Sequence, residues 1–369
     1  EGLSVKQLRA SHKVAATGLI VGLLAGTAPA LSHVPAAAAS KQNAATGSVG
    51  FLMSDYTTSA RWVFDRDFYK AALAKTDPAV TVNVSDAKNN QTTQQNNAQS
   101  ALTQGVKVLV DVPVDSAGAG QIVRLAHANK PYVPVISYDR LITGAPVDAY
   151  VSFDGFSVGV QQATYLKSKV AKGGTIVLIG GAPTDNNAHL FYNGALSVLG
   201  PLFKSGYYKK GYDKFTTGWN PALGQSEMAA ALTQLNNKVD GVLSANDGLA
   251  GGIIAALKAQ HLSGKVPVTG QDATVAGLQQ VLLGNQSMTI YKPIRKLAAA
   301  TAQVTDVLLS GKKFTSKVTV PNGAGNVPSV LLPVVTVTKA NIKSTVIADG
   351  YVTKADLCKG IPASACKGL

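Results

Sequence analysis

From Gly47 onward the chain alternates short apolar strands with helical stretches, and this alternation limits its possible folds more than any other feature. The strands are near-continuous runs of Val, Ile and Leu, which is typical of parallel sheets covered by helices on both faces. The first series of strands is 48–53, 80–84, 106–110, 132–137 and 149–152, and the second is 175–180, 241–245 and 265–269. Two series predict two parallel sheets, and therefore two α/β lobes.

The first 46 residues have the pattern of an export signal. Three basic residues between positions 6 and 13 precede an apolar segment, 14–31, and small residues around Ala37 and Ala39 fit a cleavage site. A retained membrane anchor is the alternative, although Gly, Ala and Pro dilute the apolar segment. We therefore expect an exported, extracytoplasmic protein of the periplasm or cell surface.

The two cysteines, Cys358 and Cys366, lie close together near the C-terminus. In an exported chain they predict one small disulfide loop. Such a loop would stabilise the folded state by about 2–3 kcal/mol, because it lowers the entropy of the unfolded chain. Two thiols without a nearby histidine supply at most half of a zinc site, so no metal is expected.

The formal net charge of +14 raises the question of a nucleic-acid partner. Lys and Arg are dispersed, however, apart from short Lys-Lys pairs that begin at Lys209 and Lys312. The chain has no arginine-rich run and no interleaving of basic and aromatic residues. We expect a basic exported protein that works near an anionic envelope and does not bind nucleic acid.

The polar run 89–97, "NNQTTQQNN", resembles low-complexity sequence. A pattern of apolar residues follows it at Ala98, Ala101, Leu102 and Val106. We therefore interpret the run as the solvated start of a helix. Disorder is the alternative.

Polar and charged side chains follow many of the predicted strands. The run "VPVISYDRLI", for example, begins as a buried strand and ends in the pair Asp139 and Arg140. Similar polar stretches follow four other predicted strands, namely "SDYTTSARWVFDRD", "GAPTDNNAHLF", "NDGLAGG" and "GQDAT". Ligands of open parallel sheets bind at the carboxyl ends of the strands. If the two sheets point these ends at one another, the polar side chains converge on a cleft.

The residue types in this cleft suit a pyranose sugar. The two tryptophans, Trp62 and Trp219, fall in different lobes and could stack on the C–H faces of a sugar ring, with a core position as the alternative for each. Carboxylates would accept charge-assisted hydrogen bonds from hydroxyls, cations would donate them, and amides would do both. The candidates are Asp139, Asp185, Asp272, Arg61, Arg140, Lys292, Asn187 and Asn246. Three acids and three bases balance, so the cluster can be desolvated without burying net charge.

Several motifs together resemble the sugar-binding periplasmic proteins of ABC importers in the ribose-binding-like family, and within it those that bind xylose. They are "ARWVFDRD", "GVKVLVDVPVDS", "VISYDRLI", "YVSFD", "GGAPTDNNAHLF", "VLSANDGLAGGIIAAL", "LSGKVPVTGQDA" and "MTIYKPI". They run in family order from about residue 47 to 349.

The resemblance implies the same ten contact residues. Arg61 and Trp62 match the family's Arg-Trp, and Asp139 and Arg140 match its Asp-Arg. Asp185 and Asn187 match the first and third residues of the family's Asp-Asn-Asn, and Trp219 matches its second-lobe aromatic. Asn246 matches the family's Asn-Asp, Asp272 its Gln-Asp and Lys292 its Tyr-Lys-Pro. Two positions depart from the family. Gly155 stands where Asn is common, beside a crossover between lobes. In the first loop, "SDYTTSARW", Asp55 is the only charge before the Arg-Trp pair, where the family often has more.

The fold that the resemblance implies is the type I periplasmic-binding-protein fold, in which two doubly wound parallel-sheet lobes are joined by a three-segment hinge. We expect the hinge near 152–155, 271–274 and 285–292. The expected first lobe is 47–152 with about 290–325, the second is 153–289 with about 326–349, and 350–369 is a tail.

The function that the resemblance implies is capture of a monosaccharide, with D-xylose favoured, by hinge closure and delivery to a membrane permease. The protein would be a monomer without a cofactor and not an enzyme. Ribose, arabinose, glucose and galactose remain alternative ligands. A glycosidase using Asp139 and Asp185 is the enzymatic alternative, although each acid has a base or amide beside it. A sugar-responsive repressor would need a helix-turn-helix, whereas residues 1–46 carry an apolar segment.

Overall fold

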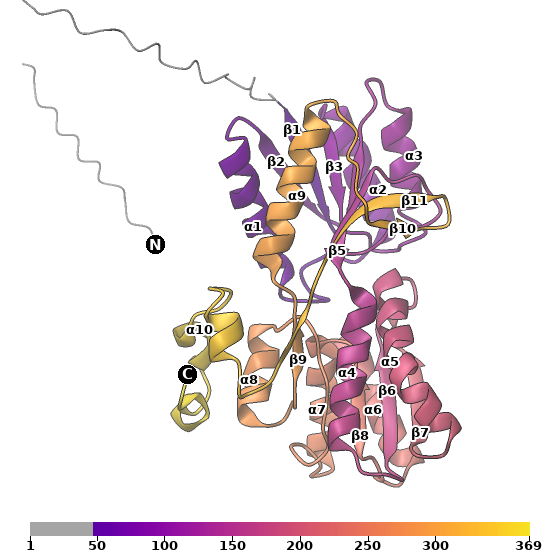
Figure 1. Ribbon diagram of the computed structural model, residues 1–369, viewed down its shortest axis with the longest axis vertical. Helices are drawn as coiled ribbons and strands as arrows, with labels where there is room; N and C mark the ends of the chain where they lie inside the picture. Colours follow the sequence, from indigo (N-terminus) through magenta and orange to yellow (C-terminus); the bar gives the residue numbers. More distant parts are fainter. Residues whose placement is uncertain (1–46) are drawn as a thin grey trace, which may run out of the picture. The chain divides into compact units, whose positions relative to one another are not determined.

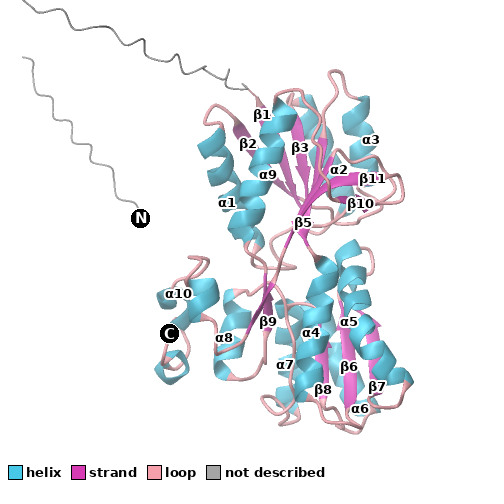
Figure 2. Ribbon diagram, in the orientation of Figure 1, coloured by secondary structure: helices cyan, strands magenta, loops and turns pink. Residues whose placement is uncertain are grey.

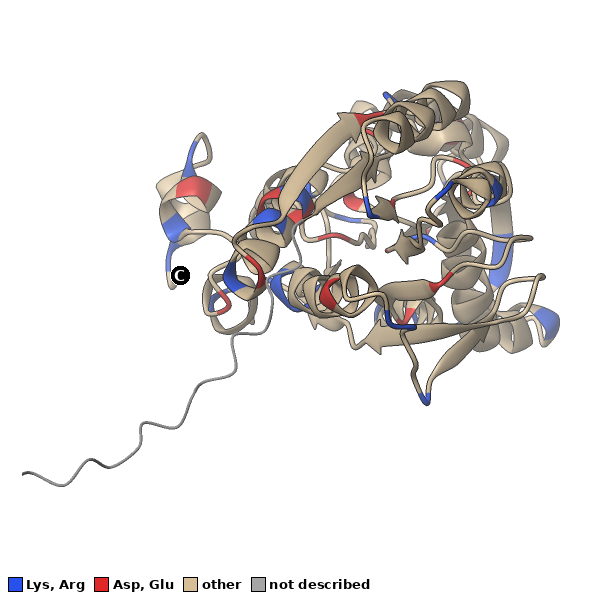
Figure 3. Ribbon diagram, turned by 90° about the horizontal axis from the view of Figure 1, so that it is seen from above, with Lys and Arg blue, Asp and Glu red and all other residues tan. Residues whose placement is uncertain are grey.

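The computed structural model describes residues 47–369, and the predicted export signal lies outside the described residues. Within this part, the chain forms two α/β lobes (Figure 1). Helices cover both sheets (Figure 2), and acidic and basic positions are interspersed along the ribbon (Figure 3). The predicted pair of parallel-sheet lobes is confirmed.

The first lobe contains a seven-stranded sheet in the order β10-β11-β5-β4-β3-β1-β2, parallel except for β10. Its strands are β1 (Ser48–Met53), β2 (Thr81–Asp86), β3 (Val108–Asp111), β4 (Val135–Tyr138), β5 (Ala149–Phe153), β10 (Thr319–Pro321) and β11 (Asn326–Leu332). Its helices are α1 (Trp62–Thr76), α2 (Gln91–Thr103), α3 (Gly120–Ala128) and α9 (Ile294–Leu309). Helix α2 begins inside the polar run 89–97, so that run starts a helix as predicted.

The second lobe contains a parallel sheet in the order β7-β6-β8 and an antiparallel pair, β9 and β12. Its strands are β6 (Thr175–Gly180), β7 (Lys209–Phe215), β8 (Gly241–Ser244), β9 (Thr289–Tyr291) and β12 (Val335–Val337). Its helices are α4 (Gly155–Lys169), α5 (Asn186–Lys204), η1 (Thr217–Trp219), α6 (Pro221–Gln234), α7 (Asp247–Ala259) and α8 (Val275–Leu283). The C-terminal segment adds η2 (Lys343–Ile347), α10 (Lys354–Cys358) and η3 (Ala363–Cys366).

Alternation along the central strands divides the core of each lobe between the two faces of its sheet. In β1, Phe51 and Met53 face the cluster that includes α1 and α9, whereas Leu52 faces the cluster that includes α2 and α3. In β6, Val177 packs toward α6 and α7, whereas Leu178 packs toward α4 and α5. This period of two is what a strand buried on both faces requires.

Helices α4 and α5 approach each other closely because glycine stands at their contact. A Cβ atom at Gly159 would lie 1.8 Å from the carbonyl oxygen of Phe191, and one at Gly194 would lie 2.1 Å from that of Phe156. Neither distance is sterically allowed. The two glycines therefore set the spacing of the helix pair that carries part of the cleft wall.

The sheet pairing corrects the predicted lobe boundary near residue 326. Strand β11 pairs with β5, for example at Ser329 and Tyr150, so 326–332 belong to the first lobe and not to the second. The chain returns to the second lobe only at β12, which pairs with β9. The crossover that was predicted near residue 326 therefore lies later in the chain, between β11 and β12.

One predicted hinge segment is also wrong. The chain crosses between the lobes after β5, between β9 and α9, and between β11 and β12. Residues 271–274 instead lie within the second lobe, because Thr274 caps α8 and the Asp272 amide donates to the Ile290 carbonyl. The hinge still has three segments, but the third follows Leu332.

The predicted strand 265–269 is reduced to a single bridge, between Val242 and Val268. Pro267 has no amide hydrogen and cannot donate to a ladder, which keeps this pairing short. The predicted disulfide between Cys358 and Cys366 is present.

Candidate functional site

A cavity lies between the lobes, and all ten residues predicted from the sequence line it. The first-lobe members are Arg61, Trp62, Asp139 and Arg140. The second-lobe and hinge members are Asp185, Asn187, Trp219, Asn246, Asp272 and Lys292. Four further residues line it that sequence reasoning missed, namely Thr58, Ser59, Phe191 and Gln271.

Strand and helix ends position the second-lobe side chains. Asp185 is the N-cap of α5, where its carboxylate accepts from the Asn187 amide at 2.9 Å. Asn246 is the N-cap of α7, where its side-chain oxygen accepts from the Leu249 amide at 2.9 Å. Since each cap satisfies a helix end that would otherwise lack a partner, both side chains are held rigidly at the cavity.

Three lining residues have left-handed backbone conformations. The φ angles are 59° at Asp139, 56° at Trp219 and 98° at Asp272. Such angles are uncommon outside glycine and cost on the order of 1–3 kcal/mol each. Their concentration at one cavity is typical of functional sites, where the surrounding structure imposes the conformation.

Thr58 links the first-lobe loop to both the aromatic wall and the second lobe. Its hydroxyl accepts from Trp62 Nε1 at 3.1 Å and donates to Asp55 at 2.9 Å, while its carbonyl accepts from Asn246 Nδ2 at 3.2 Å. Asp55 also accepts from the Thr57 and Thr58 amides, at 2.6 and 2.5 Å. Asp55 thus shapes the loop and does not line the cavity. The hydroxyl-rich run before Arg61 was the available sequence signal.

Ion pairs across the cavity join the two lobes. Arg61 of the first lobe contacts Asp272 of the second at 3.1 Å, and Arg140 contacts Asp185 at 2.8 Å. The Asp139 carboxylate forms ion pairs with Arg61 at 2.6 Å and with Lys292 at 3.4 Å. All six charged groups are nearly inaccessible to solvent. As expected from the sequence, acids and bases balance at the cavity wall.

The pKa of Asp139 reflects these neighbours. Burial alone would raise it, but Arg61, Lys292 and Arg140 outweigh burial and lower the pKa to about 2. For Asp185 the balance is opposite, because burial raises its pKa despite the opposing effects of Arg140 and the Asn187 amide. Asp139 is therefore an ionised acceptor throughout the neutral pH range.

Asp65, one turn after Arg61 on α1, supplies a further buried acid behind the cavity. Burial raises its pKa to about 6, with contributions from Asp139 and Asp272, against the lowering effect of Arg61. It accepts a 2.7 Å hydrogen bond from the Tyr138 hydroxyl and lies 3.5 Å from Arg61. This role could not be predicted from the sequence, because an acid on a helix such as α1 is ordinarily a solvated residue.

Asp65→Asn is expected to stabilise the protein at high pH. The folded state keeps the Asp65 proton up to about pH 6, whereas an unfolded aspartate releases it near pH 4, so ionisation of Asp65 opposes folding above pH 6. At pH 8 the variant should gain on the order of 1–3 kcal/mol in unfolding free energy. The gain should shrink as the pH falls from 6 to 4, which urea titrations at pH 4.5, 6 and 8 would measure. A gain independent of pH would contradict the assignment.

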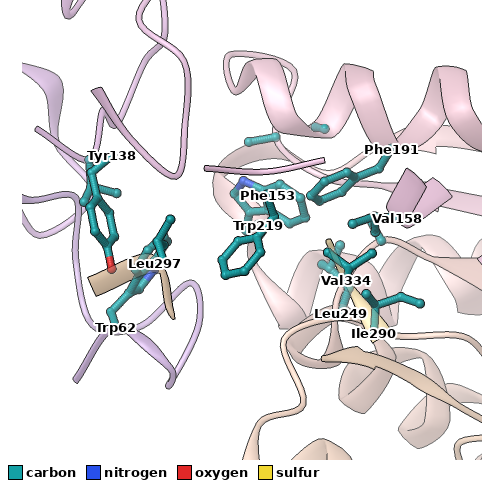
Figure 4. Close-up of a cluster of buried hydrophobic side chains, with 14 of the residues drawn as sticks. Trp62, Tyr138, Phe153, Val158, Phe191, Trp219, Leu249, Ile290, Leu297 and Val334 are labelled. Atoms are coloured by element: carbon teal, nitrogen blue, oxygen red, sulfur yellow. The ribbon is translucent and has the colours of Figure 1, made fainter. Parts of the chain in front are cut away.

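The two tryptophans line opposite walls, and Figure 4 shows Trp62 apart from Trp219, which lies with Phe191. The Arg61 guanidinium stacks on the Trp62 ring at 4.1 Å. Trp219 donates from Nε1 to Asp185 at 3.0 Å and packs edge-on against Phe191 at 6.3 Å. Both indole N–H groups therefore have protein partners, so neither is free to donate to a ligand.

Gly181 lies directly against Trp219. A Cβ atom at this position would come within 2.1–2.4 Å of three atoms of the indole ring. Gly181→Ala should therefore displace the ring and weaken ligand binding on the order of tenfold, because Trp219 cannot keep its place on the wall. Gly251→Ala is the control, since nothing lies within 4 Å of a Cβ atom there. Calorimetric titration of both variants would measure the difference, and equal affinities would show that the ring need not stay in place.

Comparison with known proteins places this cavity in a family. A family model described as a periplasmic binding protein domain matches residues 49–313. The D-xylose-binding periplasmic protein of Escherichia coli K12 is 40% identical over 310 residues, which cover 84% of this chain and 92% of the relative. A multiple sugar-binding periplasmic protein of Azospirillum brasilense is 36% identical over 371 residues, covering 94% and 99% of the two chains.

A solved structure agrees with these relatives. An ABC transporter solute binding protein from Clostridium phytofermentans, with bound β-D-glucose, is 32% identical and superimposes with a TM-score of 0.76. The match covers 84% of this chain and 99% of that one. From the sequence match and the shared two-lobe architecture, it follows that the chain belongs to the periplasmic binding protein family and has the type I fold.

Proposed function

We propose that this protein captures a single monosaccharide, with D-xylose favoured, between its two lobes and delivers it to the permease of an ABC importer. One observation carries the proposal: two tryptophans and nine charged or amide side chains, drawn from both lobes, line one cavity. Aromatic faces and charge-assisted hydrogen-bonding groups are what the C–H faces and hydroxyl rim of a pyranose require.

The preference for xylose follows the xylose-binding relatives, whereas the multiple sugar-binding relative and the glucose-bound structure support the hexose alternative.

Binding would act through closure of the lobes. Arg61, Asp139 and Arg140 lie on one wall and Asp185, Asn187 and Asp272 on the other, so a bound sugar would contact both at once. A ligand that contacts both walls stabilises the closed arrangement over an open one. The closed form would then be the form that the permease recognises.

The site of action would be outside the cytoplasm, as the names of the periplasmic relatives indicate. Among the helices of residues 47–369, none combines the length and apolar character that a membrane span needs. The proposed role is to bind a solute for transport and not to catalyse a reaction, since the family is one of solute-binding proteins. The arrangement of Asp139 agrees with this, because its ionised carboxylate is held between Arg61 and Lys292.

Intrinsic tryptophan fluorescence would test the proposal, since both tryptophans line the cavity. The protein should be titrated with D-xylose, D-ribose, L-arabinose, D-glucose and D-galactose. D-glucose adds a hydroxymethyl group to xylose and D-ribose inverts one hydroxyl, so the two isolate size and stereochemistry. Saturation by xylose at micromolar concentration, with weaker responses to the others, is the expected result.

Two further outcomes would change the proposal. If glucose binds more tightly than xylose, glucose becomes the proposed ligand. If none of the five sugars changes the fluorescence or gives a calorimetric signal, the proposal of monosaccharide capture is overturned. Release of the aryl group from an aryl xyloside would indicate the glycosidase instead.

A further inference from the structure

The C-terminal segment, residues 338–369, packs against the second lobe beside the hinge. Its buried residues Ile342, Val346 and Leu357 form one cluster with Leu278 and Leu282 of α8. Gln279 of α8 donates to the Leu357 and Lys359 carbonyls at 3.0 and 2.9 Å. The disulfide closes the end of this segment, where Cys366 is also buried. The segment is thus a fixed part of the second lobe, although nothing in it lines the cavity.

Tyr351 brings this segment into contact with the first lobe. Its side chain is only 3% exposed, and its ring centroid lies 5.1 Å from Phe64 of α1 and 5.1 Å from Tyr291 of β9. Phe64 belongs to the first lobe, whereas Tyr291 ends the strand that leads into the hinge. One ring therefore packs against both lobes at a hinge crossing.

Both neighbours of Tyr351 are close in sequence to cavity residues. Phe64 follows Arg61 by three positions, which places the two one above the other on adjacent turns of the chain at the start of α1. Tyr291 immediately precedes Lys292. Arg61 and Lys292 are the two cations that contact Asp139. Tyr351 thus packs against a residue close in the chain to each of these cations.

Further contacts fix Tyr351 in this position. The Tyr291 hydroxyl donates to Asp349, and Arg295 of α9 donates to the Gly350 carbonyl at 3.0 Å. The Arg295 guanidinium also stacks on Phe68 of α1 at 4.0 Å. Asp349 and Gly350, the two residues before Tyr351, are therefore hydrogen-bonded to β9 and to α9, the first helix after the hinge crossing.

We propose that Tyr351 is a positioning residue for ligand binding, which holds Arg61 and Lys292 in register across the closed hinge through its contacts with Phe64 and Tyr291. The proposal rests on the proposed function. The ring rather than the hydroxyl performs this role, because the Tyr351 hydroxyl has no hydrogen-bond partner among the described residues. Loss of the ring would leave a gap at the junction and favour opening of the lobes.

The test compares Tyr351→Ala with Tyr351→Phe and with a control distant from the hinge. Leu199→Ala serves as the control, since Leu199 of α5 is fully buried in a cluster with residues of α4 and β6, and its truncation should destabilise the fold without touching the hinge. Sugar dissociation constants and dissociation rates would be measured by stopped-flow tryptophan fluorescence. Urea unfolding would report stability in parallel.

Tyr351→Ala should weaken xylose binding about tenfold, mainly by faster dissociation, whereas Tyr351→Phe should stay within about twofold of the wild type. Leu199→Ala should lower the unfolding midpoint and leave the affinity unchanged. If Tyr351→Ala does not fold, Tyr351→Leu, which keeps apolar volume but loses the ring, should weaken binding severalfold.

The inference is overturned if Tyr351→Ala binds within twofold of the wild type, or if Leu199→Ala weakens binding as much as Tyr351→Ala does. Failure of the proposed function gives a different result, in which the wild type itself binds none of the five sugars. In that case both fail together, and the variants are not needed to show it.

Discussion

Asp139→Ala is expected to weaken sugar binding by at least about 100-fold. Asp139 is the shared acceptor of the cavity, since its carboxylate contacts Arg61 at 2.6 Å and Lys292 at 3.4 Å and accepts from Asn187 at 3.0 Å. Removing one partner of a buried ion pair costs about 3–5 kcal/mol, because the remaining charge loses its compensation. Arg61 would keep its contact with Asp272, so the larger loss falls on Lys292. When the lobes open, water can hydrate both cations, so the cost falls on the closed, ligand-bound form.

Two variants separate charge from shape at this position. Asp139→Asn keeps the size of the side chain and suits the left-handed backbone, since asparagine tolerates a φ of 59° better than alanine does. Its loss of affinity should therefore be smaller than that of Asp139→Ala. Asp213→Ala removes an ion pair with Lys210 on β7, outside the cavity, and should change affinity less than twofold. Isothermal titration with xylose would measure all three, and wild-type affinity in Asp139→Ala would remove Asp139 from the site.

Trp219→Ala is expected to weaken binding by about 2–4 kcal/mol, the loss typical of an aromatic hot spot. The change removes a wall of the cavity and deprives Asp185 of the N–H that reaches it at 3.0 Å. Trp219→Phe keeps an aromatic face but not this hydrogen bond, so its loss should be smaller. Calorimetry is the suitable measurement, because the substitution also removes one of the two fluorescent reporters. Unchanged affinity in Trp219→Ala would show that the ring does not contact the ligand.

The cavity residues could be predicted largely from the sequence because they follow recognisable strands. An apolar run that ends in Asp139 and Arg140, or in Asn246, indicates the carboxyl end of a parallel strand, and two facing sheets bring such ends together. Phe191 was missed for the opposite reason. It lies within α5, where a phenylalanine ordinarily indicates core packing, and it both packs in the core and lines the cavity.

The missed strands belong mainly to edges and hinge segments. β7, "KKGYDKF", carries charged residues that protect a sheet edge, so its composition does not resemble that of a buried strand. β11 contains Pro328 and pairs with β5 far earlier in the chain. Local sequence cannot show which lobe such a strand joins, and this is why the predicted boundary near 326 was wrong.

The pairing of β11 with β5 also has a consequence for biosynthesis. All of α4 to β9, the bulk of the second lobe, lies between these two strands in the sequence. Until Asn326–Leu332 is available, β5 is an uncovered edge of the first-lobe sheet, and such edges can pair with other chains. The second lobe is nearly continuous in sequence and can form before the first is complete. Because β11 comes so late in the chain, the first-lobe sheet would be exposed to such pairing for most of synthesis, and chaperones that shield β5 would protect it.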